Sequence, residues 1–227
     1  MKFDKQNIKP FIEYKIVPYN SNITTVGLLL FLVLGLVVGL SNPVPILASL
    51  MILCSFICYI IAMILYDSKR SILYQNLFIS AMLFCFSVIM LFASYKFFMG
   101  YSAKVKIYVL LIIVTLYILT TIVLCALTLK KVHNGFFSTE QGKKAINNRF
   151  TFGAITALII LFLIFKFFLL SDNTDISLTI VAMGCLCLSL YMCTCYSRLL
   201  RVILQLKYKI ADESLEEYFQ RNQNKSK

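Results

Sequence analysis

Long apolar runs separated by short polar stretches make up most of this chain of 227 residues. A helix needs about 20 apolar residues to cross a hydrocarbon core of about 30 Å. Six runs approach or exceed that length, so the pattern predicts an all-α membrane protein, a six-transmembrane-helix bundle. The predicted spans cover residues 23–40, 43–66, 72–98, 107–129, 151–170 and 178–197, each within a few residues.

The polar connection at residues 130–149 sets the predicted orientation. It reads KKVHNGFFSTEQGKKAINNR, with five basic residues and one acid. Lys and Arg near span ends keep such a segment on the cytoplasmic side of a membrane. Alternation from this loop places both termini in the cytoplasm, together with the basic connection at residues 67–70. Lys104 and Lys106 fall on the outer side, against this rule.

Residues 1–22 form a separate N-terminal segment. Apolar residues recur there at near-helical spacing among four lysines. This pattern is typical of a short amphipathic helix that lies in the membrane interface. The segment therefore precedes a membrane domain at residues 23–197.

Residues 198–227 form a basic juxtamembrane helix and a polar tail. Four polar residues follow one stripe of the helix, and apolar residues follow the opposite stripe. The polar stripe consists of Arg198, Arg201, Gln205 and Lys209. Ser214 and Glu217 match a capping box, which predicts the start of a further short helix. The stretch from Arg221 to Lys227 is expected to be disordered.

Composition supports lipid as the solvent of this chain. It is 60% hydrophobic and 14% charged, whereas a soluble domain is about 45–50% apolar and about 25% charged. The net charge of +12 sits mainly at span ends, which favours anionic lipids of the cytoplasmic leaflet over nucleic acid. The plasma membrane is the expected location. The residues predicted to bind the membrane surface or a partner are Arg198, Arg201, Lys209, Lys130 and Lys131.

The ionisable residues limit the possible chemistry. None of the ten acidic residues lies within a predicted span, which argues against a proton-coupled carrier. Lys166 is embedded in the apolar run LFLIFKFFLL of the fifth span. It is either a contact for an anion or substrate, or a lysine whose ammonium reaches the membrane surface.

Small and weakly polar residues follow one face of several spans. In the third span these are Asn76, Ser80, Ser87 and Ser94, and in the fourth Tyr117, Thr121, Cys125 and Thr128. Such faces usually pack helices together through close approach and hydrogen bonds. The alternative is a mildly polar cavity for an uncharged or amphipathic ligand, with Lys166, Tyr117, Thr121 and Ser87 as its predicted ligand-binding residues.

Eight cysteines and one histidine invite a metal or enzyme interpretation. The cysteines lie inside spans without the compact spacing of a zinc site, so we predict no metal and no cofactor. A histidine beside a thiol can activate a nucleophile, and His133 with Cys125 or Cys195 would resemble the pair of membrane-embedded cysteine peptidases. We assign no catalytic residue.

The favoured function is a non-enzymatic membrane protein that binds a protein partner, as an accessory subunit or a toxin-immunity protein does. The second is a small transporter or permease subunit for a lipid-like, peptide or neutral solute. The His–Cys peptidase is the least supported. A homo-oligomer is compatible with all three.

Overall fold

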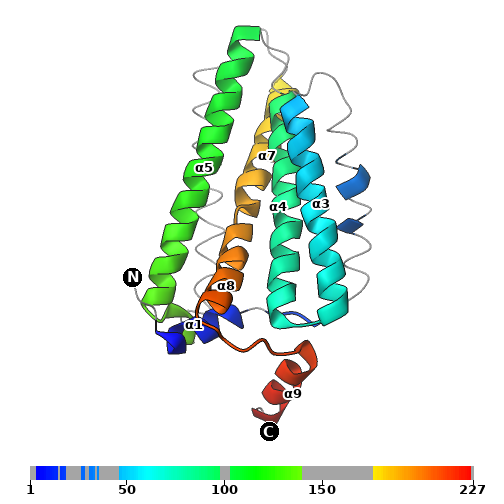
Figure 1. The fold of residues 1–227 in the computed structure, drawn as a ribbon. Coiled ribbons are helices and arrows are strands. Elements are labelled where there is room, and N and C mark those ends of the chain that lie inside the picture. The colour runs from blue at the N-terminus through cyan, green and yellow to red at the C-terminus, as the bar shows by residue number, and fades with distance from the viewer. Residues whose placement is uncertain are drawn as a thin grey trace.

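The described part of the chain is all-helical (Figure 1). The computed structural model describes residues 4–14, 16–18, 27–28, 31–33, 35, 46–97, 103–139 and 176–225. Its elements in chain order are α1 (Lys5–Ile12), α3 (Ile46–Lys69), α4 (Ile72–Phe97), α5 (Ala103–His133), the 3₁₀ turn η2 (Phe136–Ser138), α7 (Ile176–Met192), α8 (Cys195–Lys207) and α9 (Leu215–Lys225).

Four helical segments of the described chain are long and apolar enough to cross a membrane: Ser49–Lys69, Ile72–Lys96, Leu110–His133 and Ala182–Lys207. They correspond to the second, third, fourth and sixth predicted spans, and the last continues beyond its predicted end near residue 197. The fifth predicted span, 151–170, lies outside the described residues. Of the first, 23–40, only residues 27–28, 31–33 and 35 are described, and these are helical.

Helix α4 is the centre of the bundle. It packs against α3 on one side and against α7 and α8 on the other. Apolar residues occur all round α4, as expected for a helix buried among others. Its face of small and polar residues was predicted correctly, because Asn76, Ser80, Ser87 and Ser94 are all buried.

Helices α3 and α5 expose large apolar side chains. On α5 these include Leu111, Ile118, Leu119, Ile122 and Val123, each more than half exposed. A monomeric protein in water rarely exposes apolar patches of this extent. This surface suits a hydrocarbon environment, in agreement with the length of the helices.

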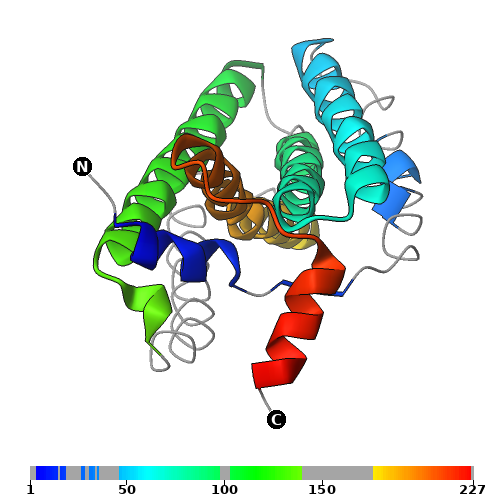
Figure 2. The same ribbon diagram turned by 60° about the horizontal axis from the view of Figure 1, so that its bottom comes forward.

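Basic side chains gather at one end of the bundle, which we call the base. It comprises α1, the turn between α3 and α4, the C-terminal ends of α5 and α8, and α9 (Figure 1). Figure 2 shows α1 lying across the ends of α5 and α8, which it contacts. Basic residues in or next to these elements, with described side chains, include Lys5, Lys9, Lys69, Arg70, Lys130, Lys131, Lys207, Lys209 and Arg221. The basic segments expected in the cytoplasm therefore share one end.

Polar side chains of α4 hold the N-terminal segment against the base. The Gln75 amide donates to the carbonyl oxygen of Val17 and accepts from its backbone N–H at 3.3 Å. The Asn76 amide donates to the carbonyl oxygen of Ile12 at 3.3 Å. Ile8, Phe11 and Ile12 of α1 are buried by the same packing. The apolar face predicted for this helix therefore packs against the rest of the protein.

The C-terminal tail is also ordered against the base. The predicted capping box is confirmed: the Ser214 N–H donates to Glu217 Oε2, and the Glu217 N–H donates to Ser214 Oγ, both at 3.2 Å. The prediction of disorder from Arg221 onward is wrong as far as Lys225, because α9 continues to that residue. Arg221 forms ion pairs of 3.0 Å with both Glu13 and Glu213.

Candidate functional site

Three of the four predicted ligand-binding residues meet between α4, α5 and α7. Ser87 Oγ donates to the carbonyl oxygen of Ser189 at 2.9 Å, and Ser189 Oγ donates to that of Ser87 at 2.8 Å. The Tyr117 hydroxyl lies 3.1 Å from Ser87 Oγ. Thr121 Oγ1 donates to the carbonyl oxygen of Tyr117 at 2.9 Å.

This hydroxyl cluster satisfies its hydrogen bonds within the protein. Ser87 and Ser189 are fully buried, and their reciprocal bonds join α4 to α7. Hydroxyl contacts of this kind hold helices together in a membrane. The arrangement favours the packing interpretation, and a ligand role for these residues stays a prediction. Lys166, the fourth predicted ligand residue, lies outside the described residues.

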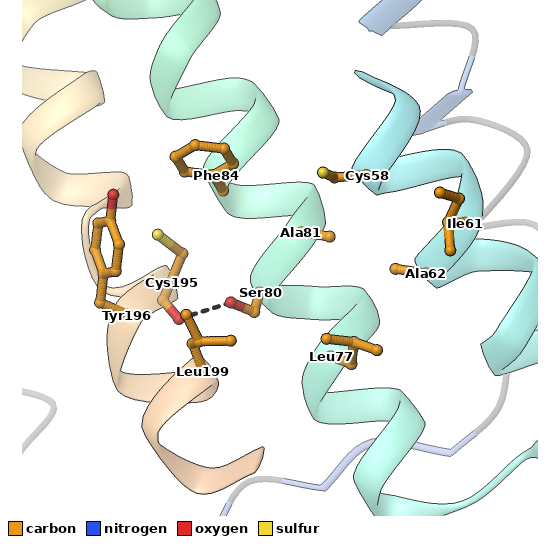
Figure 3. Close-up of a pocket in the computed structure, with 10 residues that line it drawn as sticks. All are labelled: Cys58, Ile61, Ala62, Leu77, Ser80, Ala81, Phe84, Cys195, Tyr196 and Leu199. Atoms are coloured by element: carbon orange, nitrogen blue, oxygen red, sulfur yellow. Dashed lines mark hydrogen bonds between the residues drawn. The ribbon is translucent and has the colours of Figure 1, made fainter. Parts of the chain in front are cut away.

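An open groove of about 430 Å³ runs along α4 between α3 and α8 (Figure 3). Its floor is a two-turn stretch of α4, and its walls come from the two flanking helices. The lining residues are Leu77, Ser80, Ala81 and Phe84 on α4, Cys58, Ile61 and Ala62 on α3, and Cys195, Tyr196 and Leu199 on α8. No charged side chain lines it, so an occupant must be largely apolar.

A break in helical geometry between α7 and α8 adjoins this groove. The N–H groups of Cys193, Thr194, Tyr196 and Ser197 bond to carbonyl oxygens three residues back, at 3.0–3.3 Å. Ser80 Oγ donates to the carbonyl oxygen of Cys195 at 3.0 Å and ties α4 to the start of α8 (Figure 3). Short stretches of this tighter geometry inside a long helix often mark a functional or strained segment.

The middle of the polar stripe, at Arg201 and Gln205, faces the protein, whereas the sequence pattern predicted that the stripe lies at the membrane surface. Arg201 and Gln205 are buried, at 4% and 3% exposure, whereas Ile203 and Leu206 on the opposite stripe are 48% and 62% exposed. The physical reason is that α4 and the N-terminal segment offer polar partners that a surrounding hydrocarbon lacks. Arg201 is therefore covered by the protein's own residues.

Two arginines of this stripe converge on one side-chain oxygen. Arg198 Nη1 donates to Asn76 Oδ1 at 3.0 Å, and Arg201 Nη1 approaches the same atom at 3.5 Å. Arg201 Nη1 also donates to the carbonyl oxygen of Tyr14. The Arg201 guanidinium lies 5.0 Å from the Phe11 ring centroid and 5.6 Å from that of Tyr14. We call Arg198, Arg201 and Asn76 the arginine centre.

Tyr14 contributes no negative charge to the arginine centre at neutral pH. Burial raises the pKa of its phenol, and the positive charges of Arg201 and Arg198 only partly offset this effect. The phenol consequently stays protonated in the physiological range. Tyr14 contacts the Arg201 guanidinium through its aromatic ring and its backbone carbonyl oxygen.

The other residues predicted to bind the membrane surface or a partner are more accessible. Lys209 and Lys130 are exposed, and Lys131 is half-buried. Lys131 Nζ lies 5.5 Å from the centroid of the Phe136 ring. All three lie at the base, where an anionic surface or a partner can reach them. Their binding roles stay predictions.

The structure separates His133 from the cysteine proposed to pair with it in α8. Thr121 Oγ1 is 3.7 Å from the Sγ of Cys193, which lies two residues before Cys195. His133 lies twelve residues further along α5, about 18 Å away along the helix axis. Cys125, eight residues before His133, is about 12 Å away along that axis. Within the described ranges, no group of three His, Cys, Asp or Glu residues is placed to hold a metal ion.

Gln75 and Asp212 are important polar residues that the sequence analysis did not single out. Gln75 holds Val17, and Asp212 accepts hydrogen bonds from Ser71 and Gln205. A signal was present: Gln75 and Asn76 are adjacent amides at the start of a long apolar run, and buried amides need partners. Comparisons of this chain with protein-family models, with curated proteins and with solved structures give no match.

Proposed function

We propose that this chain is a non-enzymatic, multi-pass membrane protein that binds the membrane-spanning helix of a partner protein in the groove between α3 and α8. The observation that carries the proposal is the groove itself, which is lined almost entirely by apolar side chains (Figure 3). Its floor includes Ala81, which is small and partly exposed, whereas Ser80 and Ala62 beside it are almost fully buried. Small residues of this kind let a second helix approach closely within lipid.

The length of the groove suits contact with about two turns of a helix. Its floor from Leu77 to Phe84 spans about 10.5 Å of α4, and one helical turn rises about 5.4 Å.

The proposed orientation places the base in the cytoplasm. The predicted inner segments contribute its basic residues, and basic residues near span ends are retained on that side. The partner helix would then cross the plasma membrane beside α3 and α8. Six spans in the full chain remain part of this proposal.

A photo-crosslinking amino acid at Ala81, introduced into the full-length protein in native membranes, tests the proposal. We expect one discrete crosslinked protein from this position and none from the matched position Ile64, which is 58% exposed on α3 and does not line the groove. Ala81→Trp should fill the groove and abolish co-purification of the crosslinked protein, whereas Ile64→Trp should retain it. Crosslinks to lipid alone, equal at both positions, would contradict a partner helix.

The break between α7 and α8 favours a second candidate function, the transport or binding of a lipid-like or neutral solute. Cys195 and Tyr196 follow this break and line the groove. Discontinuous helices beside a binding site are common in transporters. Lipid-only crosslinks at Ala81, together with thermal stabilisation by one class of lipid, would favour this candidate over the partner helix.

A further inference from the structure

We infer that the arginine centre is a binding site for a phosphate group, supplied by the headgroup of an anionic lipid or by free phosphate. The site lies apart from the groove, since none of its three residues lines that groove. The inference rests on the charge, burial and unfilled hydrogen-bonding capacity of Arg201, taken together with the converging guanidinium of Arg198.

The described residues around Arg201 are carbonyl groups and aromatic rings, and none of them carries a negative charge. Its partners are the Tyr14 carbonyl oxygen, the shared oxygen of Asn76 and the rings of Phe11 and Tyr14. No carboxylate of the described residues lies within 4.0 Å of Arg201. A buried cation without an opposite charge is costly, and ionisable residues held within a membrane commonly mark a functional site.

The nearby carboxylates are engaged elsewhere at the base. Glu13 pairs with Arg221 at 3.0 Å and with Lys9 at 3.8 Å. Asp212 accepts hydrogen bonds from Ser71, Gln205 and the backbone N–H of Leu73. Among the described residues, these contacts leave no carboxylate paired with Arg201.

The hydrogen-bonding capacity of the centre matches an oxyanion. Arg201 Nε is buried without a hydrogen-bond partner among the described residues. Arg198 is only partly buried, and its guanidinium lies beside that of Arg201, since both reach Asn76 Oδ1. Paired arginines are well suited to phosphate, because each planar guanidinium can donate two parallel hydrogen bonds to its oxygens.

The depth of the centre is that of lipid headgroups. The span Ala182–Lys207 has 26 residues, or about 39 Å, close to the thickness of about 40–45 Å for a bilayer with its headgroups. Arg201 is six residues from Lys207, the end of the span at the base, so it lies about 9 Å from that end along the helix axis. That position is near the boundary of the hydrocarbon, where a lipid phosphate can reach.

Native mass spectrometry and thermal unfolding of the purified full-length protein test the inference. The probes are phosphatidylglycerol, phosphatidylcholine and inorganic phosphate, added separately. We expect phosphatidylglycerol to be retained and to raise the melting temperature, with phosphatidylcholine having little effect. Arg198→Gln and Arg201→Lys should weaken that binding at least about tenfold, because each loses charge-assisted hydrogen bonds. The control Lys207→Gln removes a charge from an exposed residue of the same helix and should bind as the parent does.

Each outcome decides the question. If inorganic phosphate alone raises the melting temperature and displaces phosphatidylglycerol, the site takes free phosphate. If the parent protein binds neither probe, or if Arg198→Gln and Arg201→Lys bind like Lys207→Gln, the inference is overturned and the arginines serve only to hold the N-terminal segment. Should Arg201→Lys fail to fold, Arg198→Gln alone decides, since Arg198 is only partly buried.

Discussion

The carboxylate of Asp212 caps the start of α4, because its Oδ1 accepts a 3.0 Å hydrogen bond from the backbone N–H of Leu73, 139 residues earlier in the chain. Its Oδ2 accepts from Ser71 Oγ, and the Gln205 amide donates to Oδ1 at 3.3 Å. The first N–H groups of a helix lack partners within it, and a carboxylate there also interacts favourably with the helix dipole. Asp212 thereby joins the start of α4 to the end of α8.

We expect Asp212→Ala to lower the free energy of unfolding by about 1–2 kcal/mol, the usual effect of losing a helix cap. Thermal unfolding in a mild detergent measures the change, and hydrogen exchange at Leu73 locates it. Asp212→Asn, which keeps an acceptor oxygen, should lose less. Equal stability of Asp212→Ala and the parent protein would show that water replaces this cap without cost.

The turn after α5 gives a second prediction. Gly135 has φ of +66°, and a Cβ at this position would lie 3.0 Å from Asn7 Oδ1. Gly135→Ala should therefore destabilise the protein by about 1 kcal/mol or more through backbone strain, and should loosen α1. Hydrogen exchange across residues 4–14 measures the loosening. In the double variant with Asn7→Ala, the clash between the new Cβ and Asn7 is absent. If the losses in free energy of unfolding of the two single variants simply add in the double variant, the close contact is contradicted.

The reciprocal serine bonds between α4 and α7 give a third prediction. Ser87→Ala and Ser189→Ala should each lower the free energy of unfolding by about 0.6–1.7 kcal/mol, because each removes a hydroxyl that donates to a backbone carbonyl of the other helix. Ser94→Ala is the matched control, because Ser94 is fully buried and its hydroxyl has no partner among the described residues. It should be neutral or slightly stabilising. Losses no larger than that of Ser94→Ala would show that the serine pair does not hold these helices together.

Labelling from the two sides of the membrane tests the orientation. In a cysteine-free background, single cysteines at Lys131 and Lys207 should react with a membrane-impermeant maleimide in inside-out vesicles and stay unmodified in intact cells. A cysteine at Tyr108, near the opposite end of α5 and 66% exposed, is the control for the outer side. Modification of Lys131→Cys from outside intact cells would reverse the proposed topology.

The sequence predicted the helices better than it predicted their partners. Length and hydropathy located α3, α4, α5 and the α7–α8 segment, because the cost of unpaired backbone groups in lipid leaves few alternatives to a helix. The capping box at Ser214 was equally local and equally predictable. In each case the deciding interaction lies within a few residues along the chain.

Helix α8 shows where such reasoning stops. Its two stripes were identified correctly, but the pattern does not say which stripe meets the protein. That choice depends on Asn76 and on the carbonyl oxygen of Tyr14, which lie 125 and 187 residues from Arg201. The groove is similarly long-range, since α3, α4 and α8 each contribute only part of its lining. Packing between distant segments could not be obtained from periodicity alone.

The ion pair between Glu13 and Arg221 has a consequence for biosynthesis. Residue 13 emerges from the ribosome long before residue 221, and the Tyr218 hydroxyl, which donates to the Glu13 carbonyl oxygen at 3.3 Å, is 205 residues away. During translation the N-terminal segment can meet Gln75 and Asn76 of α4 early, whereas its contacts with α8 and α9 form only after the last span has been inserted. Closure of the two ends would then be a late maturation step, after which the finished protein differs from its nascent form by the shielding of α1.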